Sequence, residues 1–276
     1  MNDPTPSSTL EEAVETPPLS GVTFGMGSHI GQLRDENEDY YGAAPDLGFF
    51  VVTDGVGGAP AGATAARLAT AAMLRSIRSS ESDPEQNDCP ASQRTPDAHG
   101  PRLVAAALTA HQMIRGFAVQ NGVVGAATTM AALWVTRDRV HFANTGDSRV
   151  YRLTDEGVER LSRDHTALQE HIELLGPPSP SWVSRLDSVV THVLGGKSSR
   201  IPAVHHGVRT ASAHDVYLLC TDGLYRMVSE ADIAFVLRSA PTPQQAADVL
   251  IDLANDFGGL DNVTCVVVHV DRERGR

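Results

Sequence analysis

The sequence has few cysteines, and their spacing excludes two common small-protein scaffolds. Cys89, Cys220 and Cys265 are the three cysteines among 276 residues, and they lie far apart in the chain. An odd number of widely separated cysteines forms neither a disulfide framework nor a zinc-binding cluster. The composition therefore favours a reducing compartment, and we expect a cytoplasmic protein.

Positive charge and long apolar runs are also scarce. The chain has 22 Lys and Arg against 34 Asp and Glu, a net charge of −12, and Lys197 is its one lysine. Nucleic acids and anionic membranes select basic surfaces, so we expect neither as a partner. No run approaches the ~18 apolar residues of a membrane span. Residues 1–20 have neither the basic residue nor the apolar stretch of a signal peptide.

What remains is the composition of one large domain with a polar N-terminal tail. With 41% apolar residues, the chain is long enough to bury a full core. Residues 1–20, rich in Pro, Ser, Thr and Glu, predict a disordered tail, and we expect the domain over residues 21–271. Within it, the polar, proline-broken residues 79–101 predict a mobile loop, and residues 166–194 predict helices broken by a GPPSPS stretch.

The hydrophobic pattern predicts strands and helices that do not alternate strictly. Strands are expected at residues 22–28, 39–44, 48–53, 127–136, 139–144, 148–153, 203–210, 215–221 and 262–270. Helices are expected at 61–78, 102–120, 229–239 and 243–257. A strict alternation would indicate a doubly wound parallel sheet, whereas this grouping predicts antiparallel sheets covered by pairs of helices, an α+β fold.

Four short acidic motifs stand at strand ends or in tight turns. They are RDENED at 34–39, TDG at 53–55, TDG at 221–223 and DN at 261–262. One Asp-Gly pair after a strand is most often a hairpin turn, but the set places carboxylates at several strand ends. Such carboxylates are held by the sheet and face water, as a hard cation such as Mg or Mn requires. The set predicts two ions about 3.5–4 Å apart, which clamp a phosphate and activate a water.

Seven motifs in a fixed order carry a family resemblance. They are RDENED (34–39), FFVVTDGVGG (49–58), ATT (127–129), ANTGDSRVYRL (143–153), LSRDHT (161–166), LLCTDGL (218–224) and GGLDNVT (258–264). Each is weak alone, but together they make the chain resemble the metal-dependent Ser/Thr protein phosphatases of type 2C, in their bacterial form. The resemblance implies a four-layer α-β-β-α sandwich, with two antiparallel sheets flanked by helical pairs.

The resemblance also implies the metal ligands. Asp54 would bridge two tightly bound Mn or Mg ions, and the Gly55 carbonyl would complete one shell. The remaining ligands would be Asp222 and Asp261 for the first ion, and Glu38 or Asp39, directly or through water, for the second.

Two further residues have implied roles and plain alternatives. Asp147, in a Gly-Asp-Ser turn, matches the aspartate of a third, weaker metal site, and its alternative is an ordinary turn residue. Arg34 would bind the substrate phosphate, a task suited to the planar guanidinium group. Its alternative is a surface ion pair with Asp35 or Glu36.

The function implied is hydrolysis of phosphoserine and phosphothreonine on proteins, by direct attack of a water that bridges the two ions. Phosphorylated proteins, among them a Ser/Thr protein kinase, are the implied partners, and we expect a monomer. Val56 stands where some members have a histidine, so a water must protonate the leaving group. The alternative is a pseudophosphatase that serves as a regulatory binding module. Its mark would be the loss of metal aspartates, and none of the four principal ones is missing.

A second phosphatase chemistry has a weaker signal. Cys220 and Arg226 have the Cys-x5-Arg spacing of cysteine-dependent phosphatases. That chemistry needs a thiolate cradled by backbone N–H groups at a helix N-terminus. Asp222 lies inside the would-be cradle, so we expect Cys220 to be a buried apolar thiol. We also expect His165 to be structural, because hard cations favour oxygen ligands.

Overall fold

The computed structural model describes residues 19–56, 61–81 and 98–271. Residues 1–18 of the expected N-terminal tail and residues 82–97 of the expected loop lie outside these ranges.

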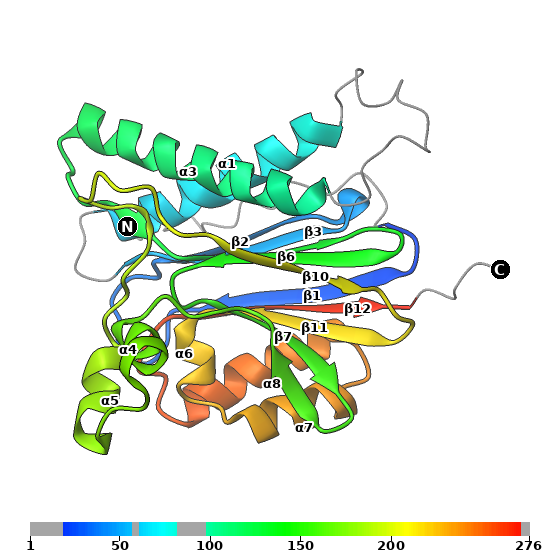
Figure 1. The fold of residues 1–276 in the computed structure, drawn as a ribbon. Helices are drawn as coiled ribbons and strands as arrows, with labels where there is room; N and C mark the ends of the chain where they lie inside the picture. The colour runs from blue at the N-terminus through cyan, green and yellow to red at the C-terminus, as the bar shows by residue number, and fades with distance from the viewer. Residues whose placement is uncertain (1–18, 57–60, 82–97, 272–276) are drawn as a thin grey trace, which may run out of the picture.

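Two five-stranded antiparallel sheets form the centre of the domain (Figure 1). The strands are β1 (Val22–His29), β2 (Asp39–Ala44), β3 (Phe49–Asp54), β4 (Ala127–Thr128), β5 (Met130–Val135), β6 (Arg139–Thr145), β7 (Arg149–Thr154), β8 (Gly157–Arg160), β9 (Leu194–Gly195), β10 (His205–Thr210), β11 (Asp215–Cys220) and β12 (Val263–Val270). One sheet has the order β1-β12-β11-β7-β8 and the other β10-β6-β5-β3-β2, while β4 and β9 form a small separate ladder.

Helices cover the outer face of each sheet. The helices of the described ranges are α1 (Gly62–Glu81), α3 (His99–Asn121), α4 (Ala167–Leu175), α5 (Pro180–Asp187), α6 (Asp222–Tyr225), α7 (Glu230–Ser239) and α8 (Pro243–Asp256), with a 3-10 turn, η1, at Pro45–Leu47. Figure 1 shows α1 and α3 over the sheet that contains β3, and α7 and α8 over the sheet that contains β12. The predicted α+β fold, a four-layer α-β-β-α sandwich, is confirmed.

Three layers of apolar side chains hold the sandwich together. In β3, Phe49 and Val51 pack toward α1 and α3, whereas Phe50 and Val52 pack between the two sheets. Successive residues of a strand point to opposite faces, so a strand buried on both faces is apolar throughout. The third layer lies between β11, β12 and the helices α7 and α8. This burial fixes the strand ends, from which the acidic residues project.

The structure corrects several expected boundaries. Helix α1 continues to Glu81 and α3 begins at His99, so both extend into the segment expected to be a loop. The strand expected at 127–136 is divided at Thr129 into β4 and β5, although the Thr129 N–H donates to the carbonyl of Asp54 at 2.8 Å in the register of the β3–β5 ladder. Strand β8 and helix α6 were not predicted. None of the helices in the described ranges is long and apolar enough to cross a bilayer.

Candidate functional site

Strands β2 and β3 place two aspartates directly opposite each other. Asp39 begins β2, Asp54 ends β3, and the ladder pairs the two residues. Directly paired residues have Cβ atoms about 4.5–5.5 Å apart, so the two carboxylates are neighbours. Burial and the nearby acids Asp39 and Asp222 raise the pKa of Asp54 well above its usual value. Burial likewise raises the pKa of Asp39 to about 7.

One oxygen of Asp39 lacks a partner among the described residues. The Thr221 hydroxyl donates to Asp39 Oδ2 at 2.8 Å, whereas Asp39 Oδ1 is buried and accepts no hydrogen bond. An unpaired buried carboxylate oxygen is costly, because it has lost its hydration without compensation. A cation bound beside Asp54 would satisfy it. The residues present therefore fit a divalent metal ion.

The other sheet supplies two more aspartates. Asp222 is the first residue of α6, just beyond β11, and Asp261 lies just before the neighbouring strand β12. Gly223 permits their approach, because a Cβ atom there would clash with the carbonyl of Asn262. The charge of Asp222 raises the pKa of Asp54, so the acids of the two sheets belong to one cluster. Burial raises the pKa of Asp222, opposed by Arg226 and reinforced by Asp261.

Glu38 and Gly55 lie beside the N-terminus of α1. The Glu38 carboxylate accepts a hydrogen bond from the backbone of Ala63, where the helix dipole favours negative charge. The Gly55 N–H donates to the Glu38 carbonyl at 3.1 Å. Of the two alternatives for the second ion, Asp39 lies with Asp54, whereas Glu38 lies against α1.

Asp147 is a buried member of the same cluster. It follows β6, and its side chain is 4% exposed. Burial raises the pKa of Asp147 to about 7; the charge of Asp222 adds to this shift and that of Arg226 opposes it. The Arg226 guanidinium donates to Asp147 Oδ2 at 3.3 Å and forms an ion pair with Asp222 Oδ2 at 2.8 Å. This contact between Arg226 and two acids was not predicted.

Arg34 lies at the rim of the cluster. Its Nη2 donates to Asp261 Oδ2 at 2.6 Å, and its side chain is 44% exposed. Its partner is thus an acid of the cluster, and neither Asp35 nor Glu36 of the surface alternative. A half-exposed guanidinium beside the acids is placed to meet an anion arriving from solvent.

Several polar residues that the sequence did not single out hold the acids in place. The Asn262 side chain accepts from the Glu38 N–H at 2.9 Å and donates to the Glu36 carbonyl at 3.0 Å, which fixes the loop carrying the RDENED motif. The Thr128 hydroxyl donates to the Asp54 carbonyl at 2.8 Å, and the Thr129 hydroxyl accepts from the Asp54 N–H at 3.2 Å. In the sequence, the signals for these residues are the Asn that follows Asp261 and the Thr pair at 128–129.

The cluster as a whole is strongly negative and partly neutralised by arginine. As the side chains stand, no three or more His, Cys, Asp or Glu groups within 19–56, 61–81 and 98–271 form a closed metal-binding set. Arg34 and Arg226 instead hold three of the acids in ion pairs. Two guanidinium groups therefore neutralise Asp261, Asp147 and Asp222, whereas Asp39 and Asp54 are paired with each other.

Cys220 and His165 have the structural character expected of them. Cys220 is fully buried in β11, and burial raises the pKa of its thiol well above the usual value, so a thiolate is disfavoured. His165 Nδ1 accepts from the Gly146 N–H at 3.1 Å, and burial lowers the pKa of His165 to about 4. Both residues stabilise the sandwich in uncharged form.

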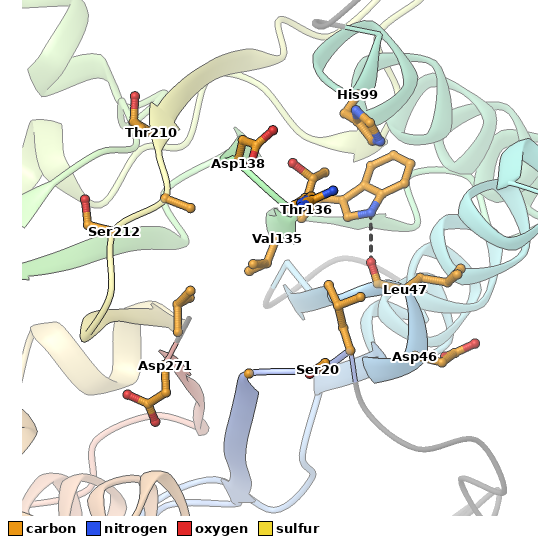
Figure 2. A pocket seen from close by; sticks show the side chains of 16 residues that line it. Ser20, Asp46, Leu47, His99, Val135, Thr136, Asp138, Thr210, Ser212 and Asp271 are labelled. Carbon is orange, nitrogen blue, oxygen red and sulfur yellow. Dashed lines mark hydrogen bonds between the residues drawn. The ribbon is translucent and has the colours of Figure 1, made fainter. Parts of the chain in front are cut away.

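A large hollow lies away from these acids. Its volume is about 1070 Å³. Its lining includes Val270, at the end of β12 opposite to Asp261, and Thr210, at the end of β10. Figure 2 shows Asp46, Asp138 and Asp271 around it, and the Trp134 indole donating to the Leu47 carbonyl. It contains none of the predicted site residues, and its acidic side chains do not suit a phosphate.

Fold and site together define a two-sheet sandwich with a carboxylate cluster at one end of its strands. The family model described as Protein phosphatase 2C matches residues 28–250. The chain therefore belongs to the protein phosphatase 2C family.

Two bacterial phosphatases are among the curated relatives of the chain. The chain is 32% identical to a serine/threonine phosphatase stp of Listeria innocua, over 52% of this chain and 57% of that protein. It is 31% identical to the serine/threonine protein phosphatase PstP of Mycobacterium tuberculosis, over 90% of this chain but 45% of that protein. It thus spans only about half the length of these two relatives.

The fold of the M. tuberculosis phosphatase PstP/Ppp matches with a TM-score of 0.77 at 28% identity, covering 91% of this chain and 99% of the solved chain. The catalytic domain of PstP, solved in complex with two manganese ions, matches with a TM-score of 0.75 at 28% identity, with the same coverage. The manganese ions belong to that protein.

Proposed function

We propose that this chain is a protein-serine/threonine phosphatase that hydrolyses phosphoserine and phosphothreonine on proteins with two divalent ions, Mn or Mg. The observation that carries the proposal is the meeting of Asp39, Asp54 and Asp222 from two sheets, with a buried Asp39 oxygen left unpaired. Family membership supports it, as do relatives named serine/threonine phosphatases and a related catalytic domain with two manganese ions.

The chain's own residues divide the task of holding the ions. Asp54 would be held between the two ions, because it is paired with Asp39 in the ladder and the charge of Asp222 acts on it. The Gly55 carbonyl and Asp261 would supply further oxygens, and Asp39 is better placed than Glu38 to hold an ion beside Asp54, because Glu38 lies against α1. When bound, such ions polarise a phosphoryl oxygen and lower the pKa of a water towards neutrality.

Arg34 binds and orients the substrate phosphate. Its guanidinium already donates to an anionic oxygen, that of Asp261, at 2.6 Å, and a phosphate offers the same kind of acceptor with more oxygens. Because the side chain is half-exposed, it can exchange partners without crossing the core. An ion held by Asp261 would release Arg34 for the phosphate.

The third, weaker ion expected at Asp147 is not part of this proposal, because the Arg226 guanidinium already contacts that carboxylate. The cytoplasmic location, the monomeric state and a Ser/Thr protein kinase as substrate are further proposals. The pseudophosphatase alternative is disfavoured, because Asp39, Asp54, Asp222 and Asp261 are all present and gathered at one end of the sandwich.

The test is hydrolysis of a phosphothreonine peptide by the purified chain, with phosphate release measured in millimolar Mn and in EDTA. We expect turnover in Mn and none in EDTA. Turnover that is equal in both conditions, or absent from folded protein in Mn, would overturn the proposal.

A further inference from the structure

We propose that Arg226 is the resident cation of the Asp147 carboxylate, so that its guanidinium group takes the place of a third divalent ion and ties helix α5 to the metal site. The inference rests on the proposed function, because it concerns the same acidic cluster. It makes Arg226 a positioning residue, which acts through Asp147 and Asp222 without touching the substrate.

Arg226 reaches three separate elements with one planar group. Its Nε forms an ion pair with Asp222 Oδ2 at 2.8 Å, and its Nη2 donates to Asp147 Oδ2 at 3.3 Å. Nη2 also donates to the carbonyl of Asp187, the last residue of α5, at 3.4 Å, while Nη1 lies 3.9 Å from Asp187 Oδ2. A guanidinium has a fixed fork of donors, which suits several oxygens at once.

The position of this guanidinium is built into the surrounding structure. The Arg226 N–H donates to the Asp222 carbonyl at 3.0 Å, so α6 sets the start of the side chain. The preceding Tyr225 donates its hydroxyl to the Asp147 carbonyl at 3.1 Å. Arg149 lies 3.5 Å from the centre of the Tyr225 ring. The backbone of each residue in the Arg226–Asp147 contact is therefore held by a hydrogen bond.

Asp147 needs a cation, and Arg226 supplies it. A carboxylate that is 4% exposed is stable in its charged form only when it is paired. A divalent ion bound to the same Asp147 and Asp222 oxygens would have to displace the guanidinium or lie next to its positive charge, which the short separation makes unfavourable. Two divalent ions, Arg34 and Arg226 together carry six positive charges. These charges equal the six negative charges of the carboxylates, which are Glu38, Asp39, Asp54, Asp147, Asp222 and Asp261.

The same contact links the metal site to α5. Helices α4 and α5 contain no buried residue, so apolar packing contributes little to their position. Backbone hydrogen bonds hold the base of this segment, from Ala167 N–H to the Val189 carbonyl at 2.9 Å and from Thr191 N–H to the His165 carbonyl at 2.8 Å. Arg226 adds a polar tether at the end of α5, beside α6 (Figure 1).

Counting bound Mn on the full chain tests the proposal. In equilibrium dialysis against Mn up to millimolar concentration, we expect two ions per wild-type chain. Arg226→Ser removes the guanidinium and frees the Asp147 and Asp222 oxygens, so we expect a third ion to bind. Adding Asp147→Asn to that variant should remove the third ion. Arg238→Ser, which alters an exposed arginine on α7, is the matched control and should keep two.

Hydrogen exchange of residues 180–187 in metal-free protein gives a second readout. We expect faster exchange in Arg226→Ser than in wild type, and no change in Arg238→Ser.

Three outcomes overturn the inference. They are a third ion on the wild-type chain that Asp147→Asn removes, two ions on a folded Arg226→Ser chain, and unchanged exchange of α5 in that variant. The wild-type and Asp147→Asn counts decide the matter even if Arg226→Ser does not fold. A wild-type chain that binds no Mn would instead defeat the proposed function itself, together with this inference.

Discussion

The acids on the two sides of the cluster are neutralised in different ways. Asp39 and Asp54, between the two sheets, have a hydroxyl and other acids as partners, and both have raised pKa values. The rim acids, by contrast, form ion pairs with arginine: Asp261 with Arg34, and Asp147 and Asp222 with Arg226. The inner pair therefore depends on an ion from solution, whereas the rim carries its own cations.

This difference distinguishes the residues that would bind metal ions from those that stabilise the surrounding structure. Burial and neighbouring acids raise the pKa values of Asp39 and Asp54, which favours their protonated forms. A metal ion that binds there replaces these protons, so the inner pair is a metal site. Acids already paired with arginine are fixed, and the guanidinium charge of Arg226 opposes the rise in pKa that burial gives Asp147 and Asp222. Variants of the two groups should therefore fail in different ways.

The largest expected effect is at the inner pair. Asp54→Asn should lower Mn-dependent turnover by about 10²–10³-fold or more, because it removes the ligand placed to hold both ions. The fold should survive, as judged by circular dichroism. Asp46→Asn is the control: Asp46 lies at the other end of the same sheet and pairs with Arg78. Full activity in Asp54→Asn would contradict the distinction between inner pair and rim.

A smaller effect is expected at the rim. Arg34→Ala should raise KM more than it lowers kcat, with a loss in kcat/KM of about 10–100-fold, the equivalent of charge-assisted hydrogen bonds worth ~1.5–3 kcal/mol. Mn affinity should not fall, because the variant removes a positive charge from Asp261. Steady-state kinetics on a phosphopeptide measures the first effect and dialysis the second. Unchanged kinetics would leave Arg34 a surface residue.

The pH dependence of the free energy of unfolding should differ between the metal-free and the metal-bound protein. The pKa of Asp39 is about 7 in the folded protein and ~3.9 in an unfolded chain, so between these values the folded form holds a proton that the unfolded chain has released. The free energy of unfolding in EDTA should therefore fall as pH rises from about 4 to about 7, by at least about 1 kcal/mol.

Saturating Mn should reverse that fall, because the ions replace the protons. Asp39→Asn should flatten the slope in EDTA. Denaturant titrations at several pH values measure both. The same slope in wild type and Asp39→Asn would show that the inner pair does not control it.

The smallest effect on activity is expected at Cys220. Cys220→Ser should leave most turnover intact and lower the free energy of unfolding by about 1 kcal/mol, because the thiol is buried in the apolar layer between β11 and the helices α7 and α8. Activity assays and denaturation curves of the same preparation measure both quantities. Loss of all turnover in a folded variant would favour a thiolate mechanism.

Much of the fold was readable in the sequence, because burial leaves a clear pattern. The run Phe49 to Val52 predicted a strand buried on both faces, and the acidic motifs predicted a cluster at strand ends. The short elements β8 and α6 were not predicted, because four residues are too few to show a hydrophobic periodicity. Arg226 was missed for another reason. Its partners Asp147 and Asp187 are distant in sequence, so only the folded chain shows that it neutralises the rim.

The most direct test of the central claim is the anomalous scattering of Mn in crystals of the wild-type chain grown in millimolar Mn. We expect two ions, both in contact with Asp54, one near Asp39 and the other near Asp222 and Asp261. We expect Arg226 to remain on Asp147, with no ion there. Ions at Asp147 with Arg226 displaced, or the absence of any ion at Asp54, would contradict the account.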